Sequence, residues 1–149
     1  MRVYLCGPMT GETYAEATDW RNDVAYKLVC LSSKIKTIDP LRGKAFLEVA
    51  GVLGNTSGKH PLESAAGIVT RDHWDVSRCD VLLVNFLDAK IVSIGSCFEI
   101  AWAFQRRIPI IIVMEKTGNI HEHCFIDICS GGFRVSSLKA AIELIKRMS

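Results

Sequence analysis

The sequence predicts a single α/β domain, residues 1–149, in which a central parallel sheet lies between two layers of helices. Short apolar runs alternate with longer segments in which apolar residues recur every three or four positions, the pattern of alternating strands and helices. The run Val81–Phe86 is almost continuously apolar, as expected of a strand covered on both faces. A length of 149 residues with 49% hydrophobic residues suits one ordinary domain with a sizeable core.

The first half of the chain contains two predicted strands, a helix and a loop. Residues 3–7 form a β-prone run closed by Gly-Pro, which predicts a first buried strand. Residues 14–29 place their apolar side chains on one helix face. A weaker strand over residues 34–38 ends at Asp39-Pro40, because proline disfavours its continuation. Residues 51–61 contain three glycines and a proline, so we expect a surface loop there.

The second half of the chain alternates helices and strands. A helix over residues 63–79 precedes a strand over 81–86, and a helix over 95–107 precedes a strand over 109–114. A loop and a small strand over 133–135 lead to a last helix, which Ser136 or Ser137 caps. Four apolar residues of this helix share one face: Leu138, Ala141, Ile142 and Ile145. The three tryptophans, Trp20, Trp74 and Trp102, are expected to be core residues.

Charge and hydropathy exclude several classes of protein. The 18 Lys and Arg residues against 16 Asp and Glu residues give a net charge of +2, so we expect neither a nucleic-acid polymer nor a membrane as partner. The apolar run Ile108–Met114 is far shorter than the ~20 residues of a membrane span, and the N-terminus lacks a secretory pattern. Six cysteines without a C-x-x-C pair predict free thiols in a reducing, cytoplasmic compartment.

Two nucleotide-binding motifs and a metal site are not supported by their spacing. Residues 54–60, GNTSGKH, have three residues between the glycines, and His60-Pro61 replaces the Ser/Thr and helix of a phosphate loop. No G-x-G-x-x-G motif occurs. His121 and His123 beside Cys124 lack a recognised zinc spacing, so we expect no metal there and favour a loop that contacts substrate or another subunit.

The segment SIGSCFEIAWAF, residues 93–104, contains a candidate nucleophile. Glu99 is expected within about the first turn of a helix, where free N–H groups and the helix dipole favour an ionised carboxylate. Its apolar neighbours place it at the edge of a pocket, which makes it a credible nucleophile. The structural alternative is a glutamate that only satisfies the helix end, and Cys97 is a second candidate nucleophile.

A second segment, Thr70–Phe86, carries three aspartates, Asp72, Asp75 and Asp80, in or beside a predicted helix. Asp72 and Asp80 are eight residues apart, about two helical turns, so they can share a face. One of them could act as acid and base beside Glu99, because paired carboxylates are the usual means of cleaving glycosidic bonds. A solvated helix face is the alternative; it suits Asp80, and the spacing alone leaves Asp72 open.

Together these motifs resemble those of the nucleoside 2-deoxyribosyltransferase family. The resemblance covers nearly the whole chain and rests on the order and spacing of VYLCGPM, DPLRGK, RDHWDVSRCDVLLVNF, SIGSCFEIAWAF and VMEKTGNIHEH. It implies a flavodoxin-like, Rossmann-like α/β sandwich and an enzyme that requires no metal or organic cofactor.

The resemblance also implies roles for particular residues. Glu99 would attack the anomeric carbon of deoxyribose, Asp72 would handle protons at the base, and Tyr4 would orient the glutamate. The substrates would be a deoxynucleoside or deoxynucleotide and a free nucleobase, in a homo-oligomer whose neighbouring subunit completes each site through residues 119–123. The positions expected to contact substrate, at strand ends and at the helix start, are Gly7, Pro8, Asp39, Ser93, Gly95, Met114, Asn119, His121 and His123.

Ser93 leaves the subclass of enzyme open. Transferases often have an acidic residue six positions before the nucleophile, whereas a serine there resembles the related 2′-deoxynucleoside 5′-monophosphate N-hydrolases, in which it helps to hold the phosphate. The first loop, residues 7–10, lacks the serine and arginine that those hydrolases use, so Arg42 or Arg71 would have to substitute. Transfer of deoxyribose is therefore the first hypothesis, hydrolysis of monophosphates the second, and a non-catalytic nucleotide-binding module the third.

Overall fold

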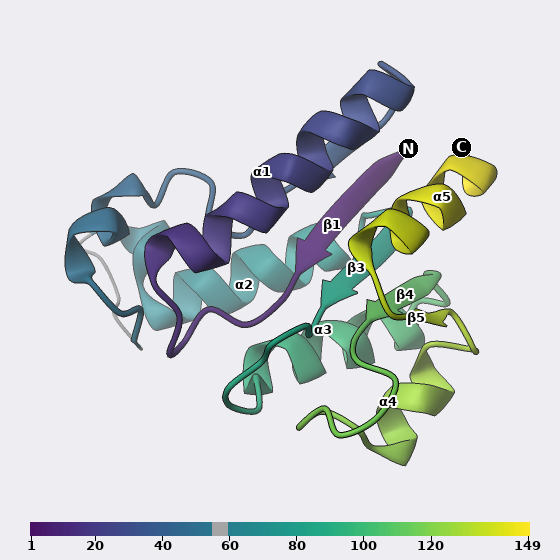
Figure 1. Cartoon of the computed structure of the whole chain (residues 1–149). Helices are drawn as coiled ribbons and strands as arrows, with labels where there is room; N and C mark the ends of the chain where they lie inside the picture. The colour runs from purple at the N-terminus through teal and green to yellow at the C-terminus, as the bar shows by residue number, and fades with distance from the viewer. Residues whose placement is uncertain (55–59) are drawn as a thin grey trace.

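The computed structural model describes residues 1–54 and 60–149, and its five strands form one parallel sheet of order β2-β1-β3-β4-β5 (Figure 1). The strands are β1 (Arg2–Cys6), β2 (Lys36–Ile38), β3 (Val81–Asn85), β4 (Ile110–Val113) and β5 (Arg134–Val135). This is the flavodoxin-like order, in which ligands bind beyond the carboxyl ends of β1 and β3, where the strand order reverses. The predicted α/β fold with a central parallel sheet is confirmed.

Helices cover both faces of the sheet and make it the middle of three layers (Figure 1). The helices α1 (Tyr14–Leu31) and α5 (Leu138–Met148) pack on one face. The helices α2 (Ala65–Val76), α3 (Ile94–Gln105) and α4 (Cys124–Cys129) pack on the other. Among the described residues between β2 and α2 are two 3₁₀ helices, η1 (Ala45–Ala50) and η2 (Pro61–Glu63).

Alternation along the buried strands distributes their side chains between the two layers. In β1, Val3 and Leu5 join the core under α1 and α5, whereas Tyr4 and Cys6 join the core under α2 and α3. Successive side chains of a strand point to opposite faces, so a residue's position in β1 decides which helix layer it meets. Tyr4 is therefore directed toward α3, the helix that carries Glu99.

Hydroxyl caps begin four of the helices. Thr13 and Glu16 form a capping box at α1, and Ser64, Ser93 and Ser137 accept backbone N–H groups at the starts of α2, α3 and α5. Such caps satisfy N–H groups that the helix leaves free. Ser137, one of the two predicted caps of the last helix, is the one used.

Some sequence-based boundaries differ from the structure. The helix predicted over residues 63–79 is instead the short η2 followed by α2, because Ser64 caps a new helix start. Since α2 ends at Val76, Asp80 cannot share a helix face with Asp72; Asp80 accepts the backbone N–H of Arg2 at 2.6 Å. The elements η1 and α4 lie in segments where no helix was predicted.

Of the three tryptophans predicted to lie in the core, Trp20 and Trp102 pack against it and Trp74 does not. Trp74 is 59% exposed on the outside of α2, where the guanidinium of Arg78 lies 3.9 Å from its ring centre. Trp20 and Trp102 are half-buried. Of the loop predicted over residues 51–61, positions 55–59 lie outside the described residues. Within the described parts of the chain, no helix is long and apolar enough to cross a membrane.

Candidate active site

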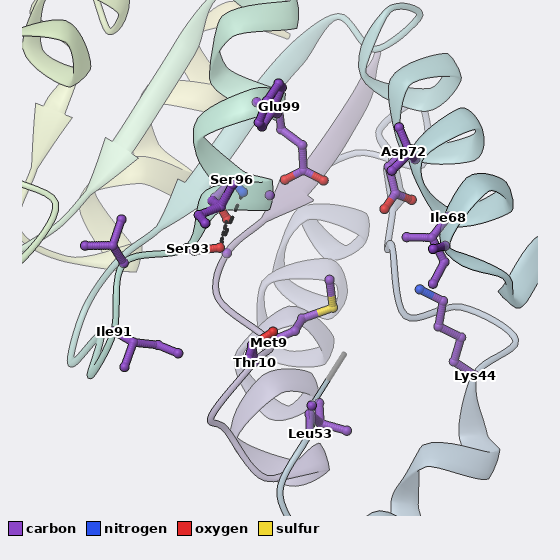
Figure 2. A pocket seen from close by; sticks show the side chains of 18 of the residues that line it. Met9, Thr10, Lys44, Leu53, Ile68, Asp72, Ile91, Ser93, Ser96 and Glu99 are labelled. Carbon is purple, nitrogen blue, oxygen red and sulfur yellow. Dashed lines mark hydrogen bonds between the residues drawn. The ribbon is translucent and has the colours of Figure 1, made fainter. Parts of the chain in front are cut away.

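A pocket of about 840 Å³ opens between α2 and the first half of α3, beside the turn that follows β1 (Figure 2). Its walls also include Lys44 from the segment after β2 and Ile91 and Ser93 from the loop that leads into α3. The carboxyl ends of β1 and β3 lie side by side in the sheet, and both chain segments that follow them reach this pocket. Its place agrees with the strand-end site predicted from the sequence.

Glu99 is buried on the pocket wall and is held by the sheet. It is 5% exposed, and the Tyr4 hydroxyl donates a hydrogen bond of 2.6 Å to its Oε1. Burial raises the pKa of Glu99 to about 7; hydrogen bonds from Cys6 and Tyr4 act against this rise without cancelling it. At neutral pH the side chain is therefore present both as carboxylate and as carboxylic acid.

This environment differs from the one predicted. Since α3 starts at Ile94, Glu99 lies in the second turn and not among the free N–H groups of the first. The helix end therefore does not hold the carboxylate in its ionised form, and the structural alternative of a helix-end glutamate is also wrong. Instead, desolvation by the core under α2 and α3 has the largest effect on the pKa of Glu99, and it raises that pKa.

Asp72 stands on α2 across the pocket from Glu99, and Figure 2 shows both carboxyl groups pointing into the same space. It is 6% exposed and forms an ion pair with Arg71, with Nη2 3.3 Å from Oδ1. Burial raises the pKa of Asp72, while Arg71 and Lys44 lower it. The charge of Asp72 in turn raises the pKa of Glu99.

The turn after β1 is fixed by a buried arginine. Arg21 of α1 donates from Nη2 to the Gly7 carbonyl at 2.9 Å and from Nε to the Leu5 carbonyl at 3.1 Å. A β-carbon on Gly7 would lie 2.9 Å from the backbone oxygen of Asn85, so only glycine lets the chain pass so close to β3. Asp39 lies 3.8 Å from Arg21 Nε, and through this ion pair it supports the turn rather than lining the pocket.

Ser93 and Ser96 form a hydroxyl pair at the start of α3. Their Oγ atoms are 2.9 Å apart, and Ser93 Oγ also accepts the backbone N–H of Ser96 (Figure 2). Both residues and Gly95 line the pocket, so this wall presents polar groups to the pocket interior.

The predicted residues of the loop over 119–123 brace the site from outside the pocket. The His121 ring stacks on Phe86 with 3.7 Å between ring centres, and its Nε2 accepts the backbone N–H of Ser93 at 2.8 Å. Asn119 donates to the Phe86 carbonyl at 2.7 Å and accepts the backbone N–H of His121. His123 is exposed and caps α4. In one copy of the chain, none of the three lines the pocket.

Some of the other predicted site residues line the pocket and some lie outside it. Gly7, Ser93 and Gly95 line the pocket together with Glu99 and Asp72, and Tyr4 reaches it through Glu99. Pro8 and Asp39 lie outside its wall, and Met114 is a core residue. Sequence reasoning missed Met9, Thr10, Lys44, Ile68 and Trp102, which also line the pocket. The segment DPLRGK pointed to the region of Lys44 but not to its side chain.

Alternative sites receive no support from the described residues. Cys97 does not line the pocket, and burial raises the pKa of its thiol, which disfavours the nucleophilic thiolate. Within residues 1–54 and 60–149, no group of three His, Cys, Asp or Glu side chains is placed to hold a metal ion. Arg42 pairs with Asp75 and Arg71 with Asp72, so both candidate phosphate-binding arginines already face carboxylates.

Comparison with known proteins identifies solved structures of similar fold. No family model and no curated protein matches the sequence. Among solved structures, a 2-deoxyribosyltransferase from Bacillus psychrosaccharolyticus superposes with a TM-score of 0.63 at 12% identity, covering 95% of this chain and 90% of that chain. A CMP N-glycosidase from Clostridium botulinum gives a TM-score of 0.53 at 13% identity over 99% of both chains.

A third structure, a 2-desoxiribosyltransferase from Leishmania mexicana, gives a TM-score of 0.52 at 16% identity, covering 78% of this chain and 65% of that chain. At such low identities the likeness shows the fold alone. The chain shares the fold of 2-deoxyribosyltransferases, as its sequence motifs predicted.

Proposed function

We propose that this protein cleaves the N-glycosidic bond of 2′-deoxynucleosides and transfers the deoxyribosyl group to a free nucleobase. The observation that carries the proposal is Glu99, buried on the wall of the pocket, held by Tyr4 at 2.6 Å and facing Asp72 (Figure 2). A pair of carboxyl groups across a pocket suits chemistry at a glycosidic carbon. The volume of about 840 Å³ is in the range of small-molecule sites. The fold shared with a 2-deoxyribosyltransferase and a CMP N-glycosidase supports this class of reaction.

In the first half-reaction, the Glu99 carboxylate attacks C1′ of the sugar from the face opposite the base. A C1′–O bond to the carboxylate forms, the C1′–N bond breaks, and the leaving base takes a proton from Asp72. Burial raises the pKa of Asp72, so that more of its acid form is present to supply this proton. The Tyr4 hydroxyl fixes the orientation of the attacking carboxylate through Oε1.

In the second half-reaction, an acceptor base gives its proton to Asp72 and attacks C1′ of the deoxyribosyl ester. The ester bond breaks, Glu99 regains its carboxylate, and two inversions give net retention at C1′. Because the sugar lacks a 2′-hydroxyl that would disfavour positive charge at C1′, a positioned carboxylate and protonation of the base are the main requirements. The acceptor base is the one co-reactant.

Product chromatography tests the proposal. The purified protein is incubated with deoxyadenosine, deoxycytidine, thymidine and their 5′-monophosphates, each with and without a free acceptor base. We expect a new nucleoside that forms only when the acceptor is present. Absence of any product from all substrates would contradict the proposal.

A matched pair of variants tests the role of Glu99. Glu99→Gln should abolish turnover, whereas Glu143→Gln, on the exposed side of α5, should leave it unchanged. Affinity for a nucleoside, measured by calorimetry, should survive in Glu99→Gln. Turnover that survives in Glu99→Gln would remove the nucleophile from the mechanism, and a wild-type protein that binds nucleosides without turnover would be a nucleotide-binding module.

A second candidate function is hydrolysis of deoxynucleoside 5′-monophosphates with water as acceptor. The observation that favours it is the Ser93–Ser96 hydroxyl pair on the pocket wall, which offers donors to a phosphate where a carboxylate would repel it. Free base released from monophosphates without an acceptor would establish this activity. Ser93→Asp should then weaken the binding of a monophosphate and spare the unphosphorylated nucleoside; an equal effect on both would show that Ser93 does not contact the phosphate.

We also propose that the protein acts as a homo-oligomer. The outer surfaces of the neighbouring helices α3 and α4 carry apolar side chains that are more than half exposed, among them Ile94, Phe98, Phe125 and Ile128. Exposed apolar groups of this size are typical of association surfaces. Ile94 and Phe98 also line the pocket, so a second copy seated on them would help to close it. Size-exclusion chromatography with light scattering should give the mass of a dimer or larger species. A monomer at all concentrations would contradict this proposal.

A further inference from the structure

Lys44 is a buried cation on the pocket wall that the reaction described above does not use. The residue follows the tight turn after β2, immediately before η1, and is only 4% exposed although its side chain lines the pocket. Figure 2 shows its Nζ directed along the α2 wall toward Ile68, with Asp72 one helical turn further along. Among residues 1–54 and 60–149, no hydrogen bond or ion pair reaches this Nζ.

The usual structural roles of a lysine do not account for this placement. A lysine that only covers apolar surface keeps its ammonium in water, whereas Lys44 is almost wholly withdrawn from it. The charge of Lys44 lowers the pKa of Asp72, but the ion pair of Asp72 is formed with Arg71 and not with Lys44. Burial lowers the pKa of Lys44 and the neighbouring charge of Arg71 lowers it further, while the carboxylates of Asp72, Asp39 and Glu99 act in the opposite direction without cancelling the fall. Because none of residues 1–54 and 60–149 accepts its N–H groups, this buried ammonium calls for an oxygen atom from a bound molecule.

The position of Lys44 indicates which part of a nucleoside it would meet. Glu99 and the hydroxyl pair of Ser93 and Ser96 belong to α3, and they would face the sugar. Asp72 stands on the opposite wall and would face the base at its glycosidic end. Lys44 lies on the Asp72 side and further from Glu99, where the remote edge of the base would lie (Figure 2).

An ammonium group has three donors and no acceptor, so it pairs with a carbonyl oxygen and opposes an amino group. We infer that Lys44 donates a hydrogen bond to the oxo group on the remote edge of the nucleobase, at position 6 of a purine or position 4 of a pyrimidine. This inference rests on the proposed function and adds a base preference to it. The pocket therefore selects 6-oxopurines and 4-oxopyrimidines over their amino counterparts.

Two pairs of nucleosides that differ at this edge test the inference. Deoxyinosine is compared with deoxyadenosine, and deoxyuridine with deoxycytidine, by calorimetric binding to Glu99→Gln, which does not consume the ligand. We expect the oxo member of each pair to bind about 10- to 100-fold more tightly, the range of a hydrogen bond to a charged group. Equal affinities, or tighter binding of the amino member, would overturn the inference without any further variant.

Substitutions of Lys44 in the same Glu99→Gln protein then test whether Lys44 causes the preference for oxo nucleobases. Lys44→Met keeps most of the stem and removes the donors, so the oxo preference should disappear, whereas Lys44→Arg should retain it. Lys139→Met removes an exposed lysine of α5 and should leave both affinities unchanged. An oxo preference that persists in Lys44→Met would overturn the inference, as would equal losses for both members of a pair.

Two further results separate this inference from its alternatives. If Lys44→Met weakens 5′-monophosphates whatever their base and spares nucleosides, Lys44 contacts the phosphate and the inference is wrong. If wild-type protein neither turns over nor binds any nucleoside, the proposed function fails and this inference fails with it. Turnover by the wild-type protein without an oxo preference overturns only the role of Lys44.

Discussion

Glu99 should make the protein less stable above neutral pH, and its replacement by glutamine should relieve this cost while abolishing turnover. The carboxyl group is 5% exposed and has a pKa of about 7 in the fold, against 4.5 for an ordinary glutamate. Between these two pH values the native state binds more protons at residue 99 than the unfolded state does. Stability therefore falls as the pH rises through this window, and the full loss is present above the native pKa.

The size of the effect follows from the pKa difference. At about 1.4 kcal/mol per pKa unit, a rise from 4.5 to about 7 destabilises the native state by about 3 kcal/mol once the carboxyl group is ionised. Glutamine is uncharged at every pH and keeps an amide oxygen that accepts the Tyr4 hydroxyl. Relative to the wild type, Glu99→Gln should gain about 3 kcal/mol at about pH 8 but less than about 1 kcal/mol at about pH 5. For a chain of 149 residues this corresponds to a rise in Tm of roughly 6–12 °C at the higher pH.

Urea unfolding followed by circular dichroism, at several pH values between about 5 and 8.5, measures this free energy. Glu143→Gln is the matched control, since its exposed carboxyl should give a difference from wild type that does not change across the same range. The reasoning would be refuted by a Glu99→Gln difference that is equal at both ends of the range. A variant that is less stable than the wild type at the higher pH would refute it as well.

Three further substitutions test residues that hold the groups of the site in position. Tyr4→Phe removes a hydrogen bond that lowers the pKa of Glu99. The acid limb of the pH profile of kcat/KM should therefore move to higher pH, and activity at neutral pH should fall about 10-fold. An acid limb that does not move would contradict this. Gly7→Ala forces a β-carbon against the backbone of β3 and should cost about 1–3 kcal/mol of unfolding free energy in urea, whereas Gly95→Ala, in open space, should cost nothing. His121→Phe keeps the ring stack but removes the acceptor of the Ser93 N–H, so calorimetric melting should show a loss of about 1–3 kcal/mol; unchanged stability would show that this hydrogen bond is dispensable.

Local sequence patterns determined the order and type of most elements. The apolar run ending at Asn85 forms β3, and a serine cap with a helical pattern after it forms α3, because these features act over a few residues. Parallel strands joined by helices leave few possible arrangements, so the pattern also predicted where a ligand would bind. The motif around Glu99 identified the candidate nucleophile for the same reason, since the residue and its helix are neighbours in the chain.

Only the tertiary structure decided the environment of each group. The sequence favoured an ionised Glu99 at a helix end, but the core contributed by distant strands buries it and raises its pKa to about 7. Whether His121 contacts substrate or holds Ser93 depends on the approach of two loops that no local pattern specifies. Lys44 is far from Asp72 in the chain and reaches the same wall through the turn after β2. Burial and the distances between charges arise from contacts across the whole chain, and these decide what each side chain can do.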